Sequence, residues 1–263
     1  MSQAGFVSLE RVSMTYGRGA SAVRAIEQVD LTIDRGEIIA VVGPSGCGKS
    51  SLLRLISGLA PPSEGRILVE GRPVRGPLKS VGMAFQNANL LPWRTALDNV
   101  LLPLEIVEPH RSRIGRERPA YVERAERLLA AVGLADFTTK FPWELSGGMQ
   151  SRTSICRALI HEPEMLVLDE PFAALDAFTR EELWCTLRDL QAEKQVTVLL
   201  VTHDLREAVF LADTVYVMSS RPGKIAARRT IELPRPRDLE LCFTPQFADI
   251  VHELRNRIGY ARH

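Results

Sequence analysis

Residues 38–50 of this chain read Ile38-Ile39-Ala40-Val41-Val42-Gly43-Pro44-Ser45-Gly46-Cys47-Gly48-Lys49-Ser50. The first five are apolar and mostly β-branched, which is typical of a strand buried on both faces of a parallel sheet. A glycine-rich turn follows, and a helix is predicted to continue over Ser51–Ile56. The turn fits the pattern G-x-x-x-x-G-K-[S/T], and it lies between a strand and a helix, as this phosphate-binding pattern requires.

The residue types of this turn suit a phosphate group. Its glycines allow successive backbone N–H groups to turn inward, and the start of the helix adds unpaired N–H groups and a positive dipole end. Lys49 would place a positive charge between the last two phosphates of a nucleotide, and the Ser50 hydroxyl would ligate Mg²⁺. The alternative is a glycine turn with a solvated lysine. The predicted nucleotide-binding residues here are Gly43, Pro44, Ser45, Gly46, Cys47, Gly48, Lys49, Ser50 and Ser51.

A second strand-like segment ends in two carboxylates and reads Met165-Leu166-Val167-Leu168-Asp169-Glu170. Side chains alternate along a strand, so Asp169 and Glu170 are expected to point in different directions. Asp169, at the strand tip, would hold Mg²⁺, usually through water, and Glu170 would polarise an attacking water. A solvated turn before Pro171 is the alternative.

The rest of the chain predicts an α/β core with an inserted helical part. Phe6–Tyr16 and Val23–Ile33 alternate apolar and polar residues, which indicates paired antiparallel strands. Val196–Val201 and Thr214–Met218 are apolar runs that predict further buried strands. In Thr95–Ile160 apolar residues recur at helical spacing and no strand pattern intervenes.

Two further segments are predicted from their composition. The basic stretch His110–Arg118 is expected to be a solvated loop, with a docking patch for lipid or a partner as the alternative. The chain becomes rich in proline and arginine from about residue 234, and one helix is expected over Phe247–Ile258.

Composition limits the classes of protein. The chain has 33 Lys and Arg against 32 Asp and Glu, a net charge of +1, so no overall positive field would hold a polyanion such as DNA. No apolar run approaches the ~20 residues that span a bilayer. The four cysteines (Cys47, Cys156, Cys185 and Cys242) form no CxxC pair, which indicates free thiols rather than a zinc site or disulfides.

Leu145-Ser146-Gly147-Gly148-Met149-Gln150 starts another predicted helix, so the chain has a second glycine-marked helix start. Such a start can bind an anion, although this one has no adjacent lysine. Together with Gly43–Ser50 and Asp169-Glu170, these residues resemble the motifs of the ABC-type ATPases, the nucleotide-binding subunits of ABC transporters. The resemblance covers essentially the whole chain.

The resemblance implies a fold and a domain plan. The fold is α/β, with a P-loop NTPase (RecA-like) core, an antiparallel β subdomain and an inserted α-helical subdomain. Residues 1–263 would form a single ABC ATPase domain. Its core would comprise about 1–88 and 161–233, its helical subdomain about 89–160, and its C-terminal tail about 234–263.

The resemblance also implies roles for residues that carry little signal alone. Tyr16 would stack on adenine, Gln86 would sense Mg²⁺ and the γ-phosphate, and His203 would contact the γ-phosphate and keep Glu170 and the water in a productive geometry. Taken singly, Tyr16 is more often an edge-packing residue, and Gln86 or His203 a satisfied polar residue. All three follow apolar strand-like runs, where open α/β sheets collect ligands.

In this family two copies face each other head to tail, so the resemblance implies a homodimer. ATP on one phosphate loop would be capped by Ser146, Gly147 and Gly148 of the other copy, with the D-loop at Ala174-Leu175-Asp176 and Asp176 counted among the nucleotide-binding residues. The expected catalytic residues are Lys49, Glu170 and His203, and the expected Mg²⁺ ligands are Ser50, Gln86 and Asp169. Ser151, Cys156 and Ala173 depart from the usual family residues, which affects the expected turnover rate and dimer coupling but not the activity class.

Two segments narrow the resemblance. Asn89–Val100 and Ile231–Asp238 are similar to the importers of nitrate, sulfonate and taurine, although importers of pyrimidine precursors and aromatic compounds look alike here. The implied protein is a peripheral ATPase on the cytoplasmic face of a bacterial inner membrane, bound to permease subunits. A periplasmic or lipid-anchored solute-binding protein would deliver the solute, and no nucleic acid would take part. Trp93 would dock the permease, with packing in the protein core as the alternative.

Two other classes of protein are weighed against this one. An ABC ATPase of DNA repair or translation would normally carry tandem cassettes, coiled-coil insertions or basic surfaces. A nucleotide-binding scaffold without activity would lack the catalytic base or the histidine that contacts the γ-phosphate, whereas Glu170 and His203 are both present. Because Cys47 lies in the phosphate loop itself, we also expect a thiol reagent to inactivate the enzyme and MgATP to protect it.

Overall fold

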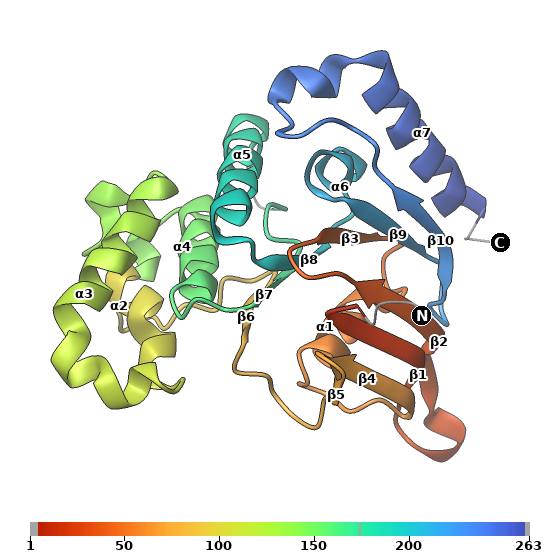
Figure 1. The fold of residues 1–263 in the computed structure, drawn as a ribbon, viewed down its shortest axis with the longest axis horizontal. Coiled ribbons are helices and arrows are strands. Elements are labelled where there is room, and N and C mark those ends of the chain that lie inside the picture. Colours follow the sequence, from red (N-terminus) through yellow and green to blue (C-terminus); the bar gives the residue numbers. More distant parts are fainter. Residues whose placement is uncertain (1–4, 174, 261–263) are drawn as a thin grey trace. The chain divides into compact units, whose positions relative to one another are not determined.

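The computed structural model describes residues 5–173 and 175–260, and its helices and strands are labelled in Figure 1. The chain divides into two compact units. Unit 1 comprises residues 1–78 and 191–263, and unit 2 comprises residues 79–190. Ala174, the first residue of the predicted D-loop, lies outside the described residues.

One sheet of unit 1 is antiparallel, with the strand order β2-β1-β4-β5. Its strands are β1 (Val7–Tyr16), β2 (Val23–Ile33), β4 (Glu64–Val69) and β5 (Arg72–Pro73), and a 3₁₀ turn, η1 (Gly19–Ser21), joins the first two. The predicted pairing of the first two strands is confirmed, with Val7 opposite Ile33 and Tyr16 opposite Val23. The alternation holds because one face of this sheet packs inward and the other meets solvent.

The other strands of unit 1 follow the order β10-β9-β3-β8. Strands β3, β8 and β9 are parallel, and β10 runs antiparallel to β9 at the edge. All five residues of β3 are fully buried, as the unbroken apolar run predicts. The strands are β3 (Ile38–Val42), β8 (Thr197–Val201), β9 (Thr214–Met218) and β10 (Ile225–Thr230).

The helices of unit 1 accompany these strands. Helix α6 packs on β3 and against α7, and α7 also contacts β9. The predicted first helix starts two residues earlier than expected, at Lys49, because the turn itself supplies the helix start at Gly48. The elements are α1 (Lys49–Ile56), α6 (Leu205–Leu211), η5 (Leu239–Phe243) and α7 (Pro245–Tyr260).

Unit 2 contains a pair of parallel strands and a group of helices. Strand β6 (Val81–Ala84) pairs with β7 (Met165–Asp169), and α4 packs on β6 and on α2. The helical character expected for residues 95–160 is confirmed. The helical elements are α2 (Ala96–Leu101), η2 (Leu102–Glu105), α3 (His110–Ala131), η3 (Ala135–Phe137), η4 (Pro142–Glu144), α4 (Gly147–Leu159) and the start of α5 (Ala177–Lys194).

The prediction of a solvated loop over His110–Arg118 was wrong, because this stretch forms the first turns of α3. Arginine and glutamate are good helix formers, so a charged stretch can be the exposed face of a helix. The apolar side of α3 lies further along and is buried through Tyr121, Ala125 and Leu128. None of the helices in the described ranges combines the length and the apolar character that a bilayer span needs.

Candidate functional site

The phosphate loop of unit 1 adopts a backbone that requires glycine. Gly46 and Gly48 have φ values of 74° and 108°, a region that other residues rarely adopt. A Cβ atom at Gly48 would lie 2.8 Å from the Ala25 carbonyl oxygen, and one at Gly43 would lie 2.9 Å from that of Met218. The loop is therefore packed against backbone at Gly43 and Gly48, where a larger residue would not fit, while Gly46 is favoured by its positive φ alone.

Lys49 is held against this loop. Its side chain is 7% exposed, and Nζ donates hydrogen bonds to the carbonyl oxygens of Gly43 (2.9 Å) and Pro44 (3.1 Å). The ammonium group is thus buried in the concave backbone and not spread into solvent, which contradicts the alternative of a solvated lysine. Ser50 follows in the first turn of α1 and is exposed.

Tyr16 and His203 also belong to unit 1. Tyr16 is the last residue of β1 and is 39% exposed, and its hydroxyl lies 3.1 Å from Ser51 Oγ on α1. The antiparallel sheet therefore places the tyrosine beside the helix that follows the phosphate loop, although Tyr16 does not follow a parallel strand as His203 does. His203 comes two residues after β8 and is exposed.

In unit 2, two residues far apart in sequence meet at the ends of β6 and β7. The parallel register pairs Ala84 with Leu168, so Gln86 and Glu170 both follow the carboxyl ends of these strands. Gln86 Nε2 donates a hydrogen bond to Glu170 Oε2 at 3.2 Å. Asp169 is the last residue of β7, and Glu170 has a positive φ of 47°.

Sequence reasoning missed a positioning residue next to Gln86. Arg157 of α4 donates to the carbonyl oxygens of Ala88 (2.6 Å) and Asn89 (2.9 Å), and burial lowers its pKa. It thereby ties the segment after Gln86 to α4. No local signal marks this arginine, because its partners are backbone atoms about 68 residues away in the chain.

The second glycine-marked turn is a capped helix start. Ser146 is the N-cap of α4, and its Oγ accepts a hydrogen bond from the Met149 N–H at 3.2 Å. Gly147 has open space around it, whereas a Cβ at Gly148 would lie 2.6 Å from Leu175 Cδ2. The start of α4 therefore keeps exposed backbone at Ser146 and Gly147.

Asp176 also caps a helix. Its Oδ1 accepts from the Thr179 N–H at 3.0 Å, in the first turn of α5. Hydrogen bonds from the Thr179 side chain and backbone lower the pKa of Asp176. The carboxylate is thus ionised, and it is exposed. Asp176 directly follows Leu175, whose side chain lies next to Gly148 of the glycine-marked turn.

The predicted metal ligands have the chemistry that Mg²⁺ prefers. Ser50, Gln86 and Asp169 offer a hydroxyl, an amide and a carboxylate oxygen, and Mg²⁺ is commonly held by one or two carboxylates together with substrate phosphates. Among the described residues, no cluster of three or more His, Cys, Asp or Glu side chains could hold a metal ion by itself. Oxygen donors of this kind fit Mg²⁺ brought with a nucleotide, whereas zinc prefers nitrogen and sulfur ligands.

The expectation of a reactive Cys47 has to be corrected. The side chain is 1% exposed, and burial raises the pKa of its thiol. The thiolate is the reactive form, so both effects oppose modification of the folded protein. Position in the loop alone suggested reactivity, because the sequence does not show that the Cys47 side chain points into the core.

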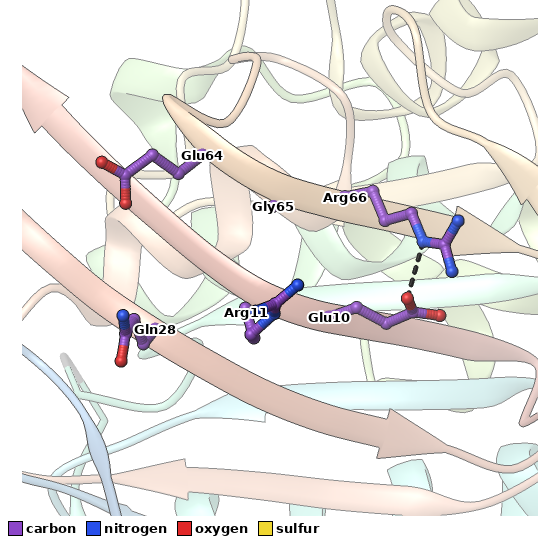
Figure 2. A pocket seen from close by; sticks show the side chains of 6 residues that line it. All are labelled: Glu10, Arg11, Gln28, Glu64, Gly65 and Arg66. Atoms are coloured by element: carbon purple, nitrogen blue, oxygen red, sulfur yellow. Dashed lines mark hydrogen bonds and ion pairs between the residues drawn. The ribbon is translucent and has the colours of Figure 1, made fainter.

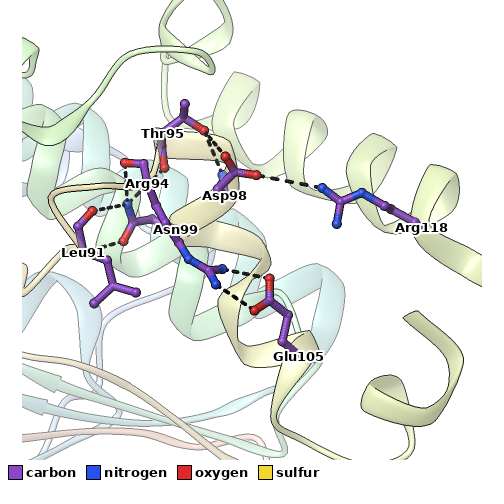
Figure 3. Close-up of polar contacts among 7 residues, drawn as sticks. All are labelled: Leu91, Arg94, Thr95, Asp98, Asn99, Glu105 and Arg118. Atoms are coloured by element: carbon purple, nitrogen blue, oxygen red, sulfur yellow. Dashed lines mark hydrogen bonds and ion pairs between the residues drawn. The ribbon is translucent and has the colours of Figure 1, made fainter. Parts of the chain in front are cut away.

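The Asn89–Val100 segment is built around a buried amide (Figure 3). Asn99 is fully buried, its Oδ1 accepts from the Leu91 N–H at 2.7 Å, and its Nδ2 lies 3.0–3.1 Å from the carbonyl oxygens of Leu91, Arg94 and Thr95. Arg94 binds Glu105 through two hydrogen bonds of 2.8 and 2.9 Å. Trp93 lies in this ordered turn and is 70% exposed, so the alternative of a core-packing tryptophan was wrong.

A cavity of about 570 Å³ lies elsewhere in unit 1, on the antiparallel sheet (Figure 2). Three of its charged side chains form ion pairs, Glu10 with Arg66 at 2.6 Å and Glu64 with Arg24 at 2.9 Å. Arg11 and Gln28 have positive φ values, and the strand pairing is irregular between Leu9 and Val12. The hollow is thus explained by bulges of the sheet.

The chain is similar to known ATP-binding proteins of transporters. A family model described as ABC transporter matches residues 26–173. The chain is 42% identical over 222 residues to the aliphatic sulfonates import ATP-binding protein SsuB of Bacillus licheniformis, covering 84% of this chain and 83% of the relative. It is 41% identical to the nitrate import ATP-binding protein NrtD of Synechococcus elongatus, covering 94% and 89%.

Further similarity comes from a bicarbonate transporter and from a solved structure. The bicarbonate transport ATP-binding protein CmpD of a Synechocystis strain is 44% identical, covering 89% of this chain and 81% of the relative. A dimeric structure of the ATP-binding cassette MJ0796 bound to ADP and Pi is 31% identical, with a TM-score of 0.75, covering 87% of this chain and all of that one. The predicted fold class is confirmed, and the chain belongs to the ABC transporter family, in which it is an ATP-binding, ATP-hydrolysing subunit.

Proposed function

We propose that this chain is the ATPase of an importer and that it hydrolyses MgATP at the phosphate loop. Lys49 neutralises the terminal phosphates, Tyr16 stacks on the adenine, and the backbone N–H groups of residues 43–51, with the exception of Pro44, surround the phosphates. The observation that supports this most directly is the buried Lys49 ammonium on the concave face of a loop that only glycine can form. A unit charge 4 Å from a phosphate is worth about 4 kcal/mol at an effective dielectric of 20.

Unit 2 contributes the groups for water activation. Glu170 accepts the proton of the attacking water, and its hydrogen bond from Gln86 links this carboxylate to the strand that precedes the helical region. His203 holds the γ-phosphate and the water in line. Ser50, Gln86 and Asp169 would hold Mg²⁺, whose charge offsets that of the phosphates when it is bound.

We further propose that the active form is a homodimer in which Ser146, Gly147 and Gly148 of one copy cap ATP on the other, with Asp176 beside them. Ser146 and Gly147 are exposed at a helix start with unpaired N–H groups, which suits a phosphate. The related cassette MJ0796 was solved as a dimer with ADP and Pi, which supports this arrangement. When two copies close around MgATP, each copy would thus complete the nucleotide site of the other.

The proposed partners are permease subunits at the cytoplasmic face of the membrane. Trp93, exposed on the turn that Asn99 and Arg94 hold, would contact the permease. We propose a small solute with an oxyanion group (nitrate, a sulfonate or taurine), because the relatives are named for sulfonates, nitrate and bicarbonate. A separate solute-binding protein would deliver it, so the ATPase does not contact the solute.

The experiment compares wild type with Glu170→Gln. Wild type should hydrolyse MgATP. Glu170→Gln should bind MgATP and lose hydrolysis, and it should accumulate as a dimer in size-exclusion chromatography with MgATP. Hydrolysis by Glu170→Gln at the wild-type rate would refute the assigned base, and a wild type that binds but never hydrolyses would indicate a nucleotide-binding scaffold. Co-purification with a multi-span membrane protein tests the permease, and uptake of labelled nitrate and taurine tests the solute.

A further inference from the structure

The segment Ile231–Asp238, which sequence similarity singled out, lies against the end of α6 in unit 1. Two of its arginines, Arg235 and Arg237, point their guanidinium groups at backbone carbonyl oxygens of residues 209–212. We refer to Arg235 and Arg237 together as the arginine clamp. The function proposed above gives these residues no role.

The clamp satisfies the backbone groups that a helix end leaves open. The last carbonyl groups of an α-helix have no partner within the helix. Arg237 Nη1 donates to the carbonyl oxygens of Val209 (2.9 Å), Phe210 (3.0 Å) and Ala212 (2.7 Å). Arg235 Nη2 donates to the remaining one, that of Leu211, at 2.8 Å.

Because Arg237 is buried, its hydrogen bonds to the helix end are necessary to stabilise its charge. Arg237 is 1% exposed, and burial lowers its pKa to about 10, so it remains charged at neutral pH. A buried cation is costly unless it is well hydrogen-bonded, and the negative end of a helix dipole favours it. Arg237 also donates to the Ile231 carbonyl oxygen at 3.2 Å. The guanidinium group therefore binds both the end of α6 and the first residue of its own segment, Ile231–Asp238.

Arg235 connects the same helix end to the strand before the phosphate loop. It forms an ion pair with Asp213 at 2.6 Å, and the other oxygen of Asp213 accepts from the Ile38 N–H at 2.9 Å. Ile38 is the first residue of β3. The clamp, the end of α6 and the start of β3 therefore share one hydrogen-bond network.

The opposite end of α6 is next to His203. Asp204 is the N-cap, and its carboxylate accepts from the N–H groups of Arg206 (2.8 Å) and Glu207 (3.3 Å). The helix spans only Leu205–Leu211, and helices this short are not stable by themselves. Its position therefore depends on its packing and on how its two ends are held.

We propose that the arginine clamp is a positioning device for His203, acting through α6. Arg237 holds the carboxyl end of the helix, Asp204 holds the amino end, and His203 is thereby presented at a constant place. This proposal rests on the proposed function only for its catalytic consequence. Its structural part, that the clamp orders His203, stands without ATP hydrolysis.

The test uses Arg237→Gln, which removes the charge and most of the donors, and Arg237→Lys. The lysine keeps the charge, but it is one bond shorter and has one nitrogen in place of the two that bind residues 209–212 and Ile231. Arg257→Gln is the matched control, because Arg257 forms an exposed ion pair with Glu253 on α7. The kinetic readouts are kcat and the affinity for a fluorescent ATP analogue. The structural readout is the NMR spectrum of histidine-labelled protein, in which His203→Ala identifies the His203 ring signal.

Arg237→Gln should lower kcat by about tenfold and change nucleotide affinity by less than about twofold, because misplacement of a catalytic group affects turnover more than binding. Arg237→Lys should lie between Gln and wild type. In a His203→Ala background Arg237→Gln should cause no further loss, since groups acting through one another are not additive. The His203 signal should shift or broaden in Arg237→Gln but not in Arg257→Gln.

An unchanged His203 signal in a folded Arg237→Gln protein would overturn the proposal, as would an equal loss of kcat in the His203→Ala background. If Arg237→Gln does not fold, Arg237→Lys and Arg235→Gln provide the same comparison with one or a few hydrogen bonds removed. A wild type without ATPase activity would refute the proposed function, while the NMR comparison would still decide on the clamp.

Discussion

Replacement of Asn99 by aspartate tests how the turn that carries Trp93 is held. The change keeps the shape of the side chain and the oxygen that accepts from the Leu91 N–H. It replaces the amide nitrogen, which carries two N–H groups, by an oxygen that faces three carbonyl oxygens at 3.0–3.1 Å. The Arg94 guanidinium cannot easily compensate, because it is already bound to Glu105 by two hydrogen bonds.

The expected magnitude follows from these contacts. Two hydrogen bonds are lost at about 1 kcal/mol each, and a buried carboxylate without a cation adds further cost, so we expect a loss of about 3 kcal/mol at pH 8. Burial and the surrounding carbonyl oxygens raise the pKa of this carboxyl in the folded state. The protonated form can donate one hydrogen bond, so the loss should fall to about 1 kcal/mol at pH 5.

The raised pKa of the buried carboxyl fixes the sign of the pH dependence. A carboxyl whose folded-state pKa is raised contributes its stability at low pH and loses it as the pH rises through the folded-state value. Urea unfolding at pH 5 and pH 8 measures the difference. Asn89→Asp is the matched control, since Asn89 is exposed in the same segment and Asp tolerates its positive φ of 46°. An Asn99→Asp midpoint equal to that of the control, or one that rises relative to wild type with pH, would refute the reasoning.

Three further predictions concern the phosphate loop. Lys49→Ala should abolish MgATP hydrolysis and weaken binding of a fluorescent ATP analogue at least about tenfold; turnover at the wild-type rate would remove the site from this loop. Gly48→Ala should lower stability by about 2 kcal/mol or more, because its φ is 108° and the new Cβ would meet the Ala25 carbonyl oxygen at 2.8 Å. Thermal unfolding should show a smaller loss for Gly46→Ala, which shares the positive φ but has only an arginine tip 3.8 Å away; equal losses would contradict the steric part. Cys47 should react with iodoacetamide far more slowly in the folded protein than in urea, and faster as the pH rises toward its raised pKa, as mass spectrometry of the modified peptide can measure; equal rates would show that the loop opens.

Much of the fold was predictable because local patterns report local structure. The apolar run before Gly43 predicted a fully buried strand, and the alternation in the first 33 residues predicted the antiparallel pair. The boundaries of α1 and the nature of His110–Arg118 were predicted less well. Charge shows which residues meet solvent, and both a loop and the outer face of a helix meet solvent.

The sequence by itself determined the phosphate loop, because a tight turn of inward N–H groups needs glycine at set positions and the adjacent lysine follows in the chain. Only the tertiary structure decided which distant groups come together. Gln86 reaches Glu170 because β6 and β7 are parallel, and Arg237 reaches the end of α6 because the tail returns across unit 1. It also decided that Cys47 is buried and Trp93 exposed. Contacts of this kind depend on the path of the backbone between segments, and that path is fixed by packing over the whole unit and not by neighbours in sequence.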